Sequence, residues 1–375
     1  MLRACKVCGN ALFPDPLLRY PDMPGVAQHL PDAGSVKDDR GFDLDIYQCS
    51  GCGLVQLDAE PVPYYREVIR AVAVSPEMTA FRRGQFRQFV AEHSLAGRNL
   101  LEVGSGRGEY LALLQEAGVK ARGLEWNEDA VGCCAAQGLA VARGFVEEED
   151  CRVPGGPFDA FAILSFFEHL PRPNAVLRGI RNNLASGAVG MVEVPNFDMI
   201  LRGNLFSEFM RDHLFYFSRR TLTTALERNG FEVLHVAEIW HDYILSATVR
   251  KREPLDLSGF TGRQEKLRTE IDAFLARHGK VAIWGAGHQA FAIMALMGLS
   301  GRVRYVVDSA PFKQGKLTPA SHIPIVAPER LLSDPVDAVL VMAGSYSDEV
   351  WATVKRMLGE GMPVAVLRET GLEEG

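Results

Sequence analysis

The sequence has no excess of positive charge: 40 lysines and arginines stand against 47 aspartates and glutamates, which gives a net charge of −7. This balance disfavours extended binding to a nucleic-acid backbone, which needs a basic stripe. The opening residues, MLRACKVCGN, contain no apolar run of the length that a secretory signal needs. The uncharged stretch from Val281 to Gly301 contains four glycines, His288 and Gln289, which favours a strand, a turn and a buried helix over a membrane span. We therefore expect a cytoplasmic protein with no nucleic-acid or membrane partner.

Internal repeats and low-complexity segments are also missing, and 47% hydrophobic against 23% charged residues is typical of folded globular proteins. At about 150 residues per domain, 375 residues predict two or three domains. Residues 1–60 are rich in proline, glycine and aspartate and cannot easily build a core alone. Residues 61–98 form a lead-in with two helical patterns, YYREVIRAV and MTAFRRGQFRQFVAEH. In the second pattern we expect the arginines to lie on a solvated face over an apolar one.

From residue 99 to residue 251, strand patterns alternate with helix patterns, which predicts a mostly parallel sheet covered on both faces. The last two apolar runs, FEVLHVAEIW and DYILSATVRK, are too close together for a crossover helix, so we expect them to pair as an antiparallel edge. Residues 252–279 are predicted to form a linker with a polar helix. The alternation restarts in residues 280–375 as a second, smaller α/β domain. The predicted fold class is therefore α/β.

Four of the seven cysteines stand in two pairs, Cys5-x-x-Cys8 and Cys49-x-x-Cys52. In a reducing compartment such pairs suggest metal binding more than disulfides. Two residues between thiolates let both sulfurs reach one tetrahedral ion, and the glycine after each pair relieves the turn behind the second ligand. We predict a structural zinc ion held by four thiolates; the alternative is four unrelated buried cysteines.

A glycine-rich turn follows the first strand of the central block, where NLLEVG leads into the turn from Gly104 to Gly108 and then a helix. A lone turn of this kind is a weak signal, because dinucleotide-binding domains also use one. Three further features sharpen it: Glu102 lies inside that strand, Glu125 ends the second strand, and Ser165 ends the third. The spacing G-x-G-x-G also differs from the G-x-G-x-x-G of nicotinamide-binding domains.

This combination resembles the class I S-adenosylmethionine-dependent methyltransferases. The resemblance implies that the main chain of the turn approaches the amino-acid part of the cofactor and that Glu125 accepts both ribose hydroxyls. It also implies that Trp126 lies against the adenine and that the acidic stretch FVEEED supplies other adenine contacts. The implied cofactor-binding residues are Glu102, Gly104, Ser105, Gly106, Gly108, Glu125, Trp126, Phe145, Val146 and Ser165.

Over nearly the whole chain, the three blocks resemble the nucleotide-sugar C-methyltransferases, with their N-terminal zinc module, central methyltransferase domain and C-terminal Rossmann-like domain. The run VVDSAPFKQGKLTPASHIPIVAPERL closely follows the last block of that family. The matching positions are Asp308, Lys313, Gln314, Gly315, Thr318, Pro319, His322, Pro324, Pro328 and Glu329. The resemblance implies methylation of a carbon of a nucleotide-linked 4-keto deoxysugar in the biosynthesis of a natural product.

In the family, a run Tyr-His-Glu-His-Leu supplies the proposed general base, and this role falls on His213 here. The family's glutamate becomes Asp212, which keeps a carboxylate beside the imidazole, and its tyrosine becomes Met210. Another family histidine matches His169, and His241 remains where the family has His-Gly-Gly-Ser, although Tyr243 replaces a glycine there.

Other interpretations of these positions stay open. The run around His213 can simply lead into the next helix, with Ser218 as its N-cap. His169 can shape only the cofactor edge, and His241 can be a turn residue. The bulk of Met210 and Tyr243 suits a non-sugar acceptor, such as an aromatic or alkaloid carbon, an oxygen or a nitrogen.

The C-terminal block opens with WGAGHQA, a strand, a glycine turn and a helix N-terminus. This pattern predicts a pocket for phosphate or another acidic part of the substrate, with His288 as a donor. A degenerate Rossmann unit that only forms a wall is the alternative. We expect a small-molecule substrate in the cleft between the domains; a regulatory module that binds nucleic acid through the cysteine pairs is a less favoured alternative.

Overall fold

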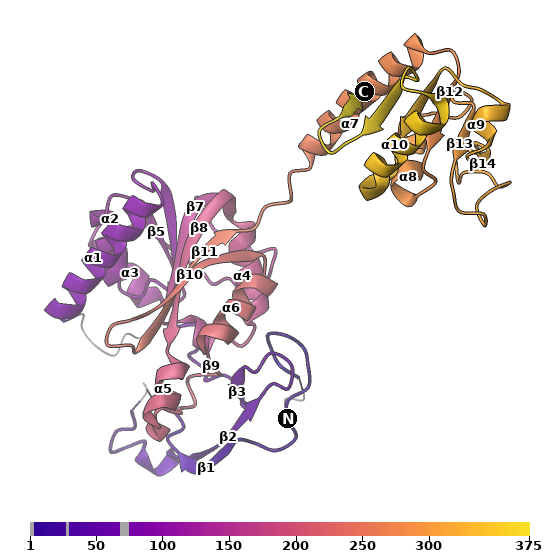
Figure 1. Cartoon of the computed structure of the whole chain (residues 1–375). Helices are drawn as coiled ribbons and strands as arrows, with labels where there is room; N and C mark the ends of the chain where they lie inside the picture. Colours follow the sequence, from indigo (N-terminus) through magenta and orange to yellow (C-terminus); the bar gives the residue numbers. More distant parts are fainter. Residues whose placement is uncertain (1–3, 28–29, 68–74) are drawn as a thin grey trace. The chain divides into compact units, whose positions relative to one another are not determined.

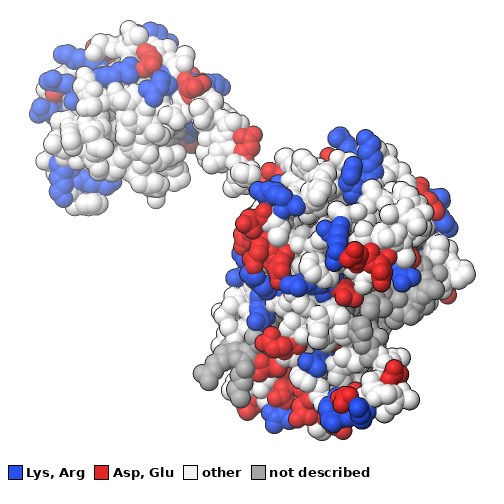
Figure 2. All heavy atoms as spheres, turned by 180° about the vertical axis from the view of Figure 1, so that it is seen from behind, with Lys and Arg blue, Asp and Glu red and all other residues white. Residues whose placement is uncertain are grey.

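The computed structural model describes residues 4–27, 30–67 and 75–375 (Figure 1). Contacts divide the chain into two units, Met1–Pro254 and Leu255–Gly375. Within the described part of the chain, no helix is long and apolar enough to cross a membrane. On the face shown in Figure 2, both units carry acidic and basic side chains intermixed.

The first unit is built on a seven-stranded sheet with the strand order β10-β11-β8-β7-β4-β5-β6. Its strands are β4 (Asn99–Val103), β5 (Lys120–Glu125), β6 (Val141–Arg143), β7 (Phe158–Leu164), β8 (Leu184–Pro195), β10 (Phe231–Ile239) and β11 (Ile244–Lys251). The strands from β4 to β8 are parallel, whereas β11 is antiparallel to both β8 and β10. The predicted parallel sheet with an antiparallel edge is confirmed.

Helices cover both faces of this sheet, because each presents an apolar stripe to the core. The helices are α1 (Pro76–Glu92), α2 (Glu109–Glu116), α3 (Glu128–Ala136), α4 (Pro173–Asn182) and α6 (Arg219–Arg228). Phe86 of α1 and Leu111 of α2 pack in one buried cluster, and Leu177 of α4 and Leu222 of α6 pack in another. The first lead-in pattern does not form a helix at its described start: residues 63–66 are turns, and residues 68–74 lie outside the described residues.

One arginine of α1 contradicts the expectation of a solvated basic face. Arg82 is 1% exposed, and its guanidinium donates to Glu193 at the end of β8 over an Nη1–Oε2 distance of 2.5 Å. Gln85 donates to the other oxygen of the Glu193 carboxylate. Arg83 lies on the outside as expected and pairs with Glu116. A buried charge partner therefore ties α1 to the central sheet.

A second sheet of the first unit joins the N-terminal block to a later part of the chain. Its antiparallel strands follow the order β1 (Leu18–Met23), β2 (Phe42–Gln48), β3 (Val55–Leu57) and β9 (Phe215–Tyr216). A short helical turn, η1 (Val36–Asp38), lies between β1 and β2, and α5 (Phe197–Gly203) adds apolar side chains to the same core. Residues 1–60 thus share their core with the segment that follows β8.

The second unit has a six-stranded sheet with the order β14-β13-β12-β15-β16-β17. Its strands are β12 (Val281–Trp284), β13 (Tyr305–Val307), β14 (Ile325–Val326), β15 (Ala338–Val341), β16 (Val364–Leu367) and β17 (Leu372–Glu374). The first five are parallel to one another in this sheet, and β17 pairs with β16 in the antiparallel direction. Its helices are α7 (Ser258–Arg277), α8 (His288–Leu296), α9 (Arg330–Ser333) and α10 (Ser347–Leu358), with the turn η4 (Gly344–Tyr346) before α10.

The predicted linker helix is part of this second unit. Leu267, Ile271 and Phe274 of α7 are buried in the core that also contains β12 and α8 residues. Glu270 accepts a hydrogen bond from the main-chain N–H of Leu372, at the start of β17, over 2.9 Å. Residues 252–279 were predicted to form a linker, but the apolar face of α7 packs in the core of the second unit, which therefore includes this helix.

Candidate active site

The glycine turn between β4 and α2 requires its glycines. Gly104, Gly106 and Gly108 have φ values of 73°, 54° and 90°, in the left-handed region that side chains avoid. A Cβ on Gly108 would lie 2.4 Å from Cδ1 of Leu139, so a side chain there would displace Leu139 and would also be strained by the positive φ. The N–H of Gly104 donates to the Leu124 carbonyl over 2.9 Å, which fastens the turn to β5.

Two carboxylates flank this turn from inside the protein. Glu125, 1% exposed at the end of β5, accepts hydrogen bonds from the main-chain N–H groups of Gly106 (2.8 Å) and Asn127 (2.9 Å). Glu102 in β4 and Ser105 in the turn are fully buried. Together they place negative charge and main-chain dipoles around the turn.

Aromatic side chains gather beyond Glu125. Trp126 is 39% exposed, and the Arg66 guanidinium lies 5.1 Å from its ring centroid. Arg66 also pairs with Glu147 over 2.7 Å, and the Phe145 ring packs edge-on against Tyr65 at 6.0 Å. These groups form a half-open surface of the kind on which an adenine stacks.

Two other predicted contact residues lie in different environments. The Val146 side chain is buried in the main hydrophobic core, where it packs near Gly179, so it does not line the aromatic surface. Ser165, at the end of β7, is exposed and adopts a φ of 51°, with its N–H donating to the Glu193 carbonyl. Its position at the carboxyl end of a parallel strand is on the same sheet edge as the glycine turn.

His169 and His213 come together although they lie 44 positions apart in the sequence. His169 belongs to the turn η2 (Phe167–His169) after β7, and His213 lies just before β9. Their ring centroids are 4.8 Å apart, with an interplanar angle of 73°. The main-chain N–H of Leu214 donates to the Glu168 carbonyl over 3.0 Å, which holds the two segments together.

Both histidines are kept neutral by their surroundings. Burial lowers the pKa of His213 to about 3, with a further contribution from His169. Burial also lowers the pKa of His169, although the Asp212 carbonyl opposes this shift. Nδ1 of His169 lies 2.8 Å from that carbonyl oxygen, so Nδ1 carries the proton and Nε2 is left as an acceptor.

The side chain and the main chain of Asp212 have different partners. Its carboxylate accepts hydrogen bonds from the Tyr64 hydroxyl (2.8 Å) and the Ala27 N–H (3.2 Å), and it is its main-chain carbonyl that faces His169. This carboxylate is therefore hydrogen-bonded to the N-terminal block, and a catalytic part for Asp212 stays a prediction. Asp212 ties the N-terminal block to the histidine segment.

Met210 lies shortly before His213, and Tyr243 lies in the turn between β10 and β11. The main-chain N–H of Met210 donates to the Tyr216 hydroxyl over 2.9 Å. The apolar side chain of Met210 is half-buried. The Tyr243 hydroxyl donates to Glu208 of the turn η3 (Phe206–Glu208) over 2.9 Å. Burial raises the pKa of Tyr243 to about 12, so this hydroxyl stays protonated.

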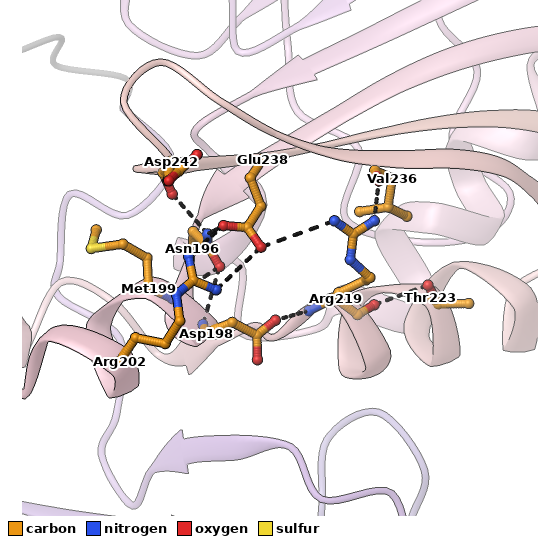
Figure 3. A network of polar contacts seen from close by, with 9 residues as sticks. All are labelled: Asn196, Asp198, Met199, Arg202, Arg219, Thr223, Val236, Glu238 and Asp242. Carbon is orange, nitrogen blue, oxygen red and sulfur yellow. Dashed lines mark hydrogen bonds and ion pairs between the residues drawn. The ribbon is translucent and has the colours of Figure 1, made fainter.

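The turn that carries Tyr243 is fixed by a polar network (Figure 3). Asn196, directly after β8, donates to the Asp242 carbonyl over 2.7 Å and to the Glu238 carboxylate over 3.0 Å. Figure 3 shows Arg202 and Arg219 on either side of Glu238. His241 is 76% exposed in this turn and pairs with Glu77, so the structure does not bring it to the other two histidines.

The four paired cysteines converge as predicted. All four Sγ atoms lie within 4.8 Å of one another, with Cys8 and Cys49 3.3 Å apart and Cys5 and Cys52 3.7 Å apart. Sulfurs around a tetrahedral zinc ion at about 2.3 Å are separated by similar distances. The N–H groups of Gly51 and Cys52 point to the Cys49 sulfur, as expected around thiolates. The donor set therefore fits a closed zinc site.

The second unit contains a cavity of about 640 Å³ at the carboxyl ends of β12, β13 and β15. His288 at the start of α8 lines it, together with Lys313 and the glycine turn after β12. Asp308 at the end of β13 accepts from the Ala286 N–H and from Lys313 Nζ, each over 2.9 Å. Lys313 therefore neutralises the one carboxylate that follows β13 at this cavity.

Three residues near the sites were not singled out from the sequence: Glu168, Arg66 and Glu208. Glu168 immediately precedes His169, and a carboxylate beside a candidate histidine is a signal that was available. Nothing in the local pattern indicates that Arg66 stacks on Trp126 or that Glu208 bonds Tyr243, because these contacts depend on the tertiary fold.

Comparisons with known proteins agree with this geometry. Residues 78–236 match the family model of the methyltransferase domain, and residues 255–366 match the C-methyltransferase C-terminal domain. The C-methyltransferase NovU of Streptomyces niveus is 26% identical over 95% of this chain and 93% of its own length. A ubiquinone biosynthesis O-methyltransferase of Methylococcus capsulatus is 36% identical, but over only 24% of this chain and 40% of its own length.

Solved methyltransferase structures align with slightly less than half of the chain. An S-adenosylmethionine-dependent methyltransferase of Mesorhizobium loti aligns with a TM-score of 0.37 and 16% identity, covering 45% of this chain and 96% of that protein. Magnesium protoporphyrin IX methyltransferase of Synechocystis aligns with a TM-score of 0.38 and 16% identity, over 46% of this chain and 83% of that protein. The two matching domains identify the chain as a class I methyltransferase, and over nearly its full length it is similar to a C-methyltransferase.

Proposed function

We propose that this enzyme methylates a carbon next to a ketone in a small biosynthetic intermediate, with His213 as the general base. By its resemblance to the nucleotide-sugar C-methyltransferases, the intermediate is a nucleotide-linked 4-keto deoxysugar. The observation that carries the proposal is the pair of neutral, half-buried imidazoles, 4.8 Å apart, at the sheet edge that also bears the glycine turn.

The first unit supplies the cofactor site in this proposal. When bound, S-adenosylmethionine supplies an electrophilic methyl group with a good leaving group. Glu125 would accept the ribose hydroxyls, the turn from Gly104 to Gly108 would hold the amino-acid end, and Trp126 would cover the adenine. Val146 would contribute its main chain only, since its side chain is in the core.

His213 would remove the proton that makes the acceptor carbon nucleophilic. A positioned base of this kind contributes about 10²–10⁴ in rate. The low pKa of His213, about 3, leaves its ring unprotonated at neutral pH but also makes it a weak base, so this step needs a nearby negative charge that stabilises the protonated ring. His169, with Nδ1 held by the Asp212 carbonyl, would orient this base from the side.

The second unit would bind the acidic part of the substrate. Its cavity offers His288 and the main-chain N–H groups at the start of α8, which favour an anion, and Lys313, which offsets the charge of Asp308; Glu349 of α10 also lines it. A nucleoside diphosphate has the charge that such a cavity accepts. The four cysteines would hold zinc as a purely structural ion, which supplies stability and leaves no open position for chemistry.

The test is an incubation with methyl-labelled S-adenosylmethionine and a panel of acceptors. We expect label on the carbon of a nucleotide-linked keto sugar, and loss of that transfer in His213→Ala with cofactor binding unchanged. Near wild-type transfer by His213→Ala would show that another group is the base.

A second candidate acceptor is favoured by one observation. Tyr243, held by Glu208 at the tip of the turn, places an aromatic ring where the family has glycine. This bulk suits a flat apolar acceptor, such as an indole or a phenol. Label on those members of the panel and none on the keto sugars would favour this candidate.

A further inference from the structure

Glu168 is a buried acid to which the proposed reaction gives no role. Its side chain is 2% exposed, and Oε2 has no hydrogen-bond partner among the described residues. Oε1 lies 3.8 Å from Nε2 of His169, the atom that the Asp212 carbonyl leaves as an acceptor. Ligand atoms of Glu168, His169 and His213 all lie within 4.8 Å of one another.

The other acids near the histidines are already engaged. The Asp212 carboxylate accepts from Tyr64, the Glu193 carboxylate pairs with buried Arg82, and the Glu208 carboxylate accepts from Tyr243. Proton transfer to His213 creates a positive charge in a buried place, where an uncompensated charge is costly. Of the acids named here, Glu168 is the one whose carboxylate faces the histidines and lacks another partner.

We propose that Glu168 is the counter-ion of the histidine pair, a positioning residue whose carboxylate stabilises the imidazolium formed when His213 takes the substrate proton. The inference rests on the proposed function. In the step, the C–H electron pair of the acceptor forms the new bond to the methyl carbon, and the bond from methyl to sulfur breaks with its electrons left on sulfur. The proton moves to a ring nitrogen of His213, within 4.8 Å of the Glu168 carboxylate.

The charge state of Glu168 makes this role dependent on pH. Burial raises the pKa of Glu168 to about 8, so the carboxylate forms only as the pH rises toward that value. The titratable groups that the structure places near it are His169 of the same turn, His213 from the segment before β9 and Tyr243 from the turn after β10. The strands β8 and β9, which also pack against η2, carry Glu193, which is paired with Arg82, and Tyr216. Activity should therefore increase with pH through the ionisation of Glu168.

The test compares pH profiles of kcat for the wild type, Glu168→Gln and Asp212→Asn. We expect the wild-type kcat to rise with an inflection near pH 8. In Glu168→Gln, kcat at pH 9 should fall by about 10²-fold, the inflection should disappear, and KM for the donor should stay unchanged. Asp212→Asn should keep the inflection, because its carboxylate serves Tyr64.

Glu168→Asp keeps the charge on a shorter side chain, so its kcat should show the same inflection as the wild type at a partly reduced level. If the glutamine variant does not fold, the aspartate variant tests the role of Glu168 instead. A glutamine variant with the wild-type profile, or a wild type without the inflection, would overturn the inference. A requirement for added Mg²⁺ or Mn²⁺ that Glu168→Gln abolishes would also overturn it, since the triad would then be a metal site. If His213→Ala stays active, the proposed function itself fails instead.

Discussion

The two units repeat one pattern of strand, glycine turn and helix, followed by a second strand that ends in an acid, yet the two acids are used differently. Glu125 in the first unit accepts hydrogen bonds from two main-chain N–H groups at the turn, those of Gly106 and Asn127. Asp308 in the second unit is paired with Lys313, and several of its interactions hold its pKa below the ordinary value against the effect of burial. The acid of the first unit is thus held by main-chain groups of the glycine turn, whereas the acid of the second unit is held by a lysine side chain as well. In the proposed function this difference separates the site of the methyl donor from the site of the acidic part of the substrate.

A substitution in the first glycine turn should give the largest effect. Gly108→Val places a side chain 2.4 Å from Leu139 at a φ of 90°, so we expect at least about 100-fold weaker binding of the donor. Binding of a nucleoside diphosphate should stay unchanged, as measured by calorimetry.

Gly287→Ala in the second turn is the matched control. A Cβ on Gly287 meets no atom within 4 Å, and the residue has a φ of −102°, so the variant should fold and bind as the wild type does. Equal damage from both variants would contradict the difference between the turns.

Removal of the cysteine site should destabilise only the first unit. The double variant Cys8→Ser, Cys52→Ser cannot hold zinc. We expect its loss to lower the free energy of unfolding of that unit by at least ~3 kcal/mol, or its melting temperature by roughly 6–12 °C. Calorimetric melting should show the transition of the second unit unmoved. If the purified wild-type protein contains no zinc bound to the four cysteines, the assignment of a zinc site is contradicted.

Acid should unfold the first unit through His213. Its pKa is lowered from 6.5 to about 3 in the folded state, so its contribution is fully present above pH 6.5 and is lost as the pH falls toward 3. This loss is on the order of a few kcal/mol. Denaturant melts of His213→Asn should show a shallower acid limb, whereas His241→Asn, at an exposed position, should not; equal limbs in both would refute the burial argument.

Lys313 should give the smallest effect. Lys313→Ala removes one ammonium from the cavity of the second unit, and we expect about 10-fold weaker binding of a nucleoside diphosphate at low salt. Affinity for the donor should not change. Unaltered diphosphate binding would show that the cavity does not take the anion.

The sequence predicted what local patterns determine. The paired cysteines, the glycine turn and the alternation of strands and helices all depend on spacings of a few residues, and the structure contains each of them. The antiparallel edge also followed from the short connection between its two strands.

Contacts between distant segments were beyond those patterns. The burial of Arg82 depends on Glu193, which lies 111 residues away, and the Asp212 carboxylate is occupied by Tyr64, 148 residues before it. The packing of α7 is different, because Leu267, Ile271 and Phe274 recur at helical spacing and indicate an apolar face that needs a partner. That signal was present and was outweighed by the polar composition of the helix.

The most direct measurement is a calorimetric titration of S-adenosylhomocysteine, the demethylated product, into the wild type, Glu125→Gln and Asp308→Asn. The wild type and Asp308→Asn should each bind one equivalent with the same affinity, and Glu125→Gln should bind about 10–100-fold more weakly. Full affinity in Glu125→Gln, or its loss in Asp308→Asn, would contradict the assignment of the donor to the first unit.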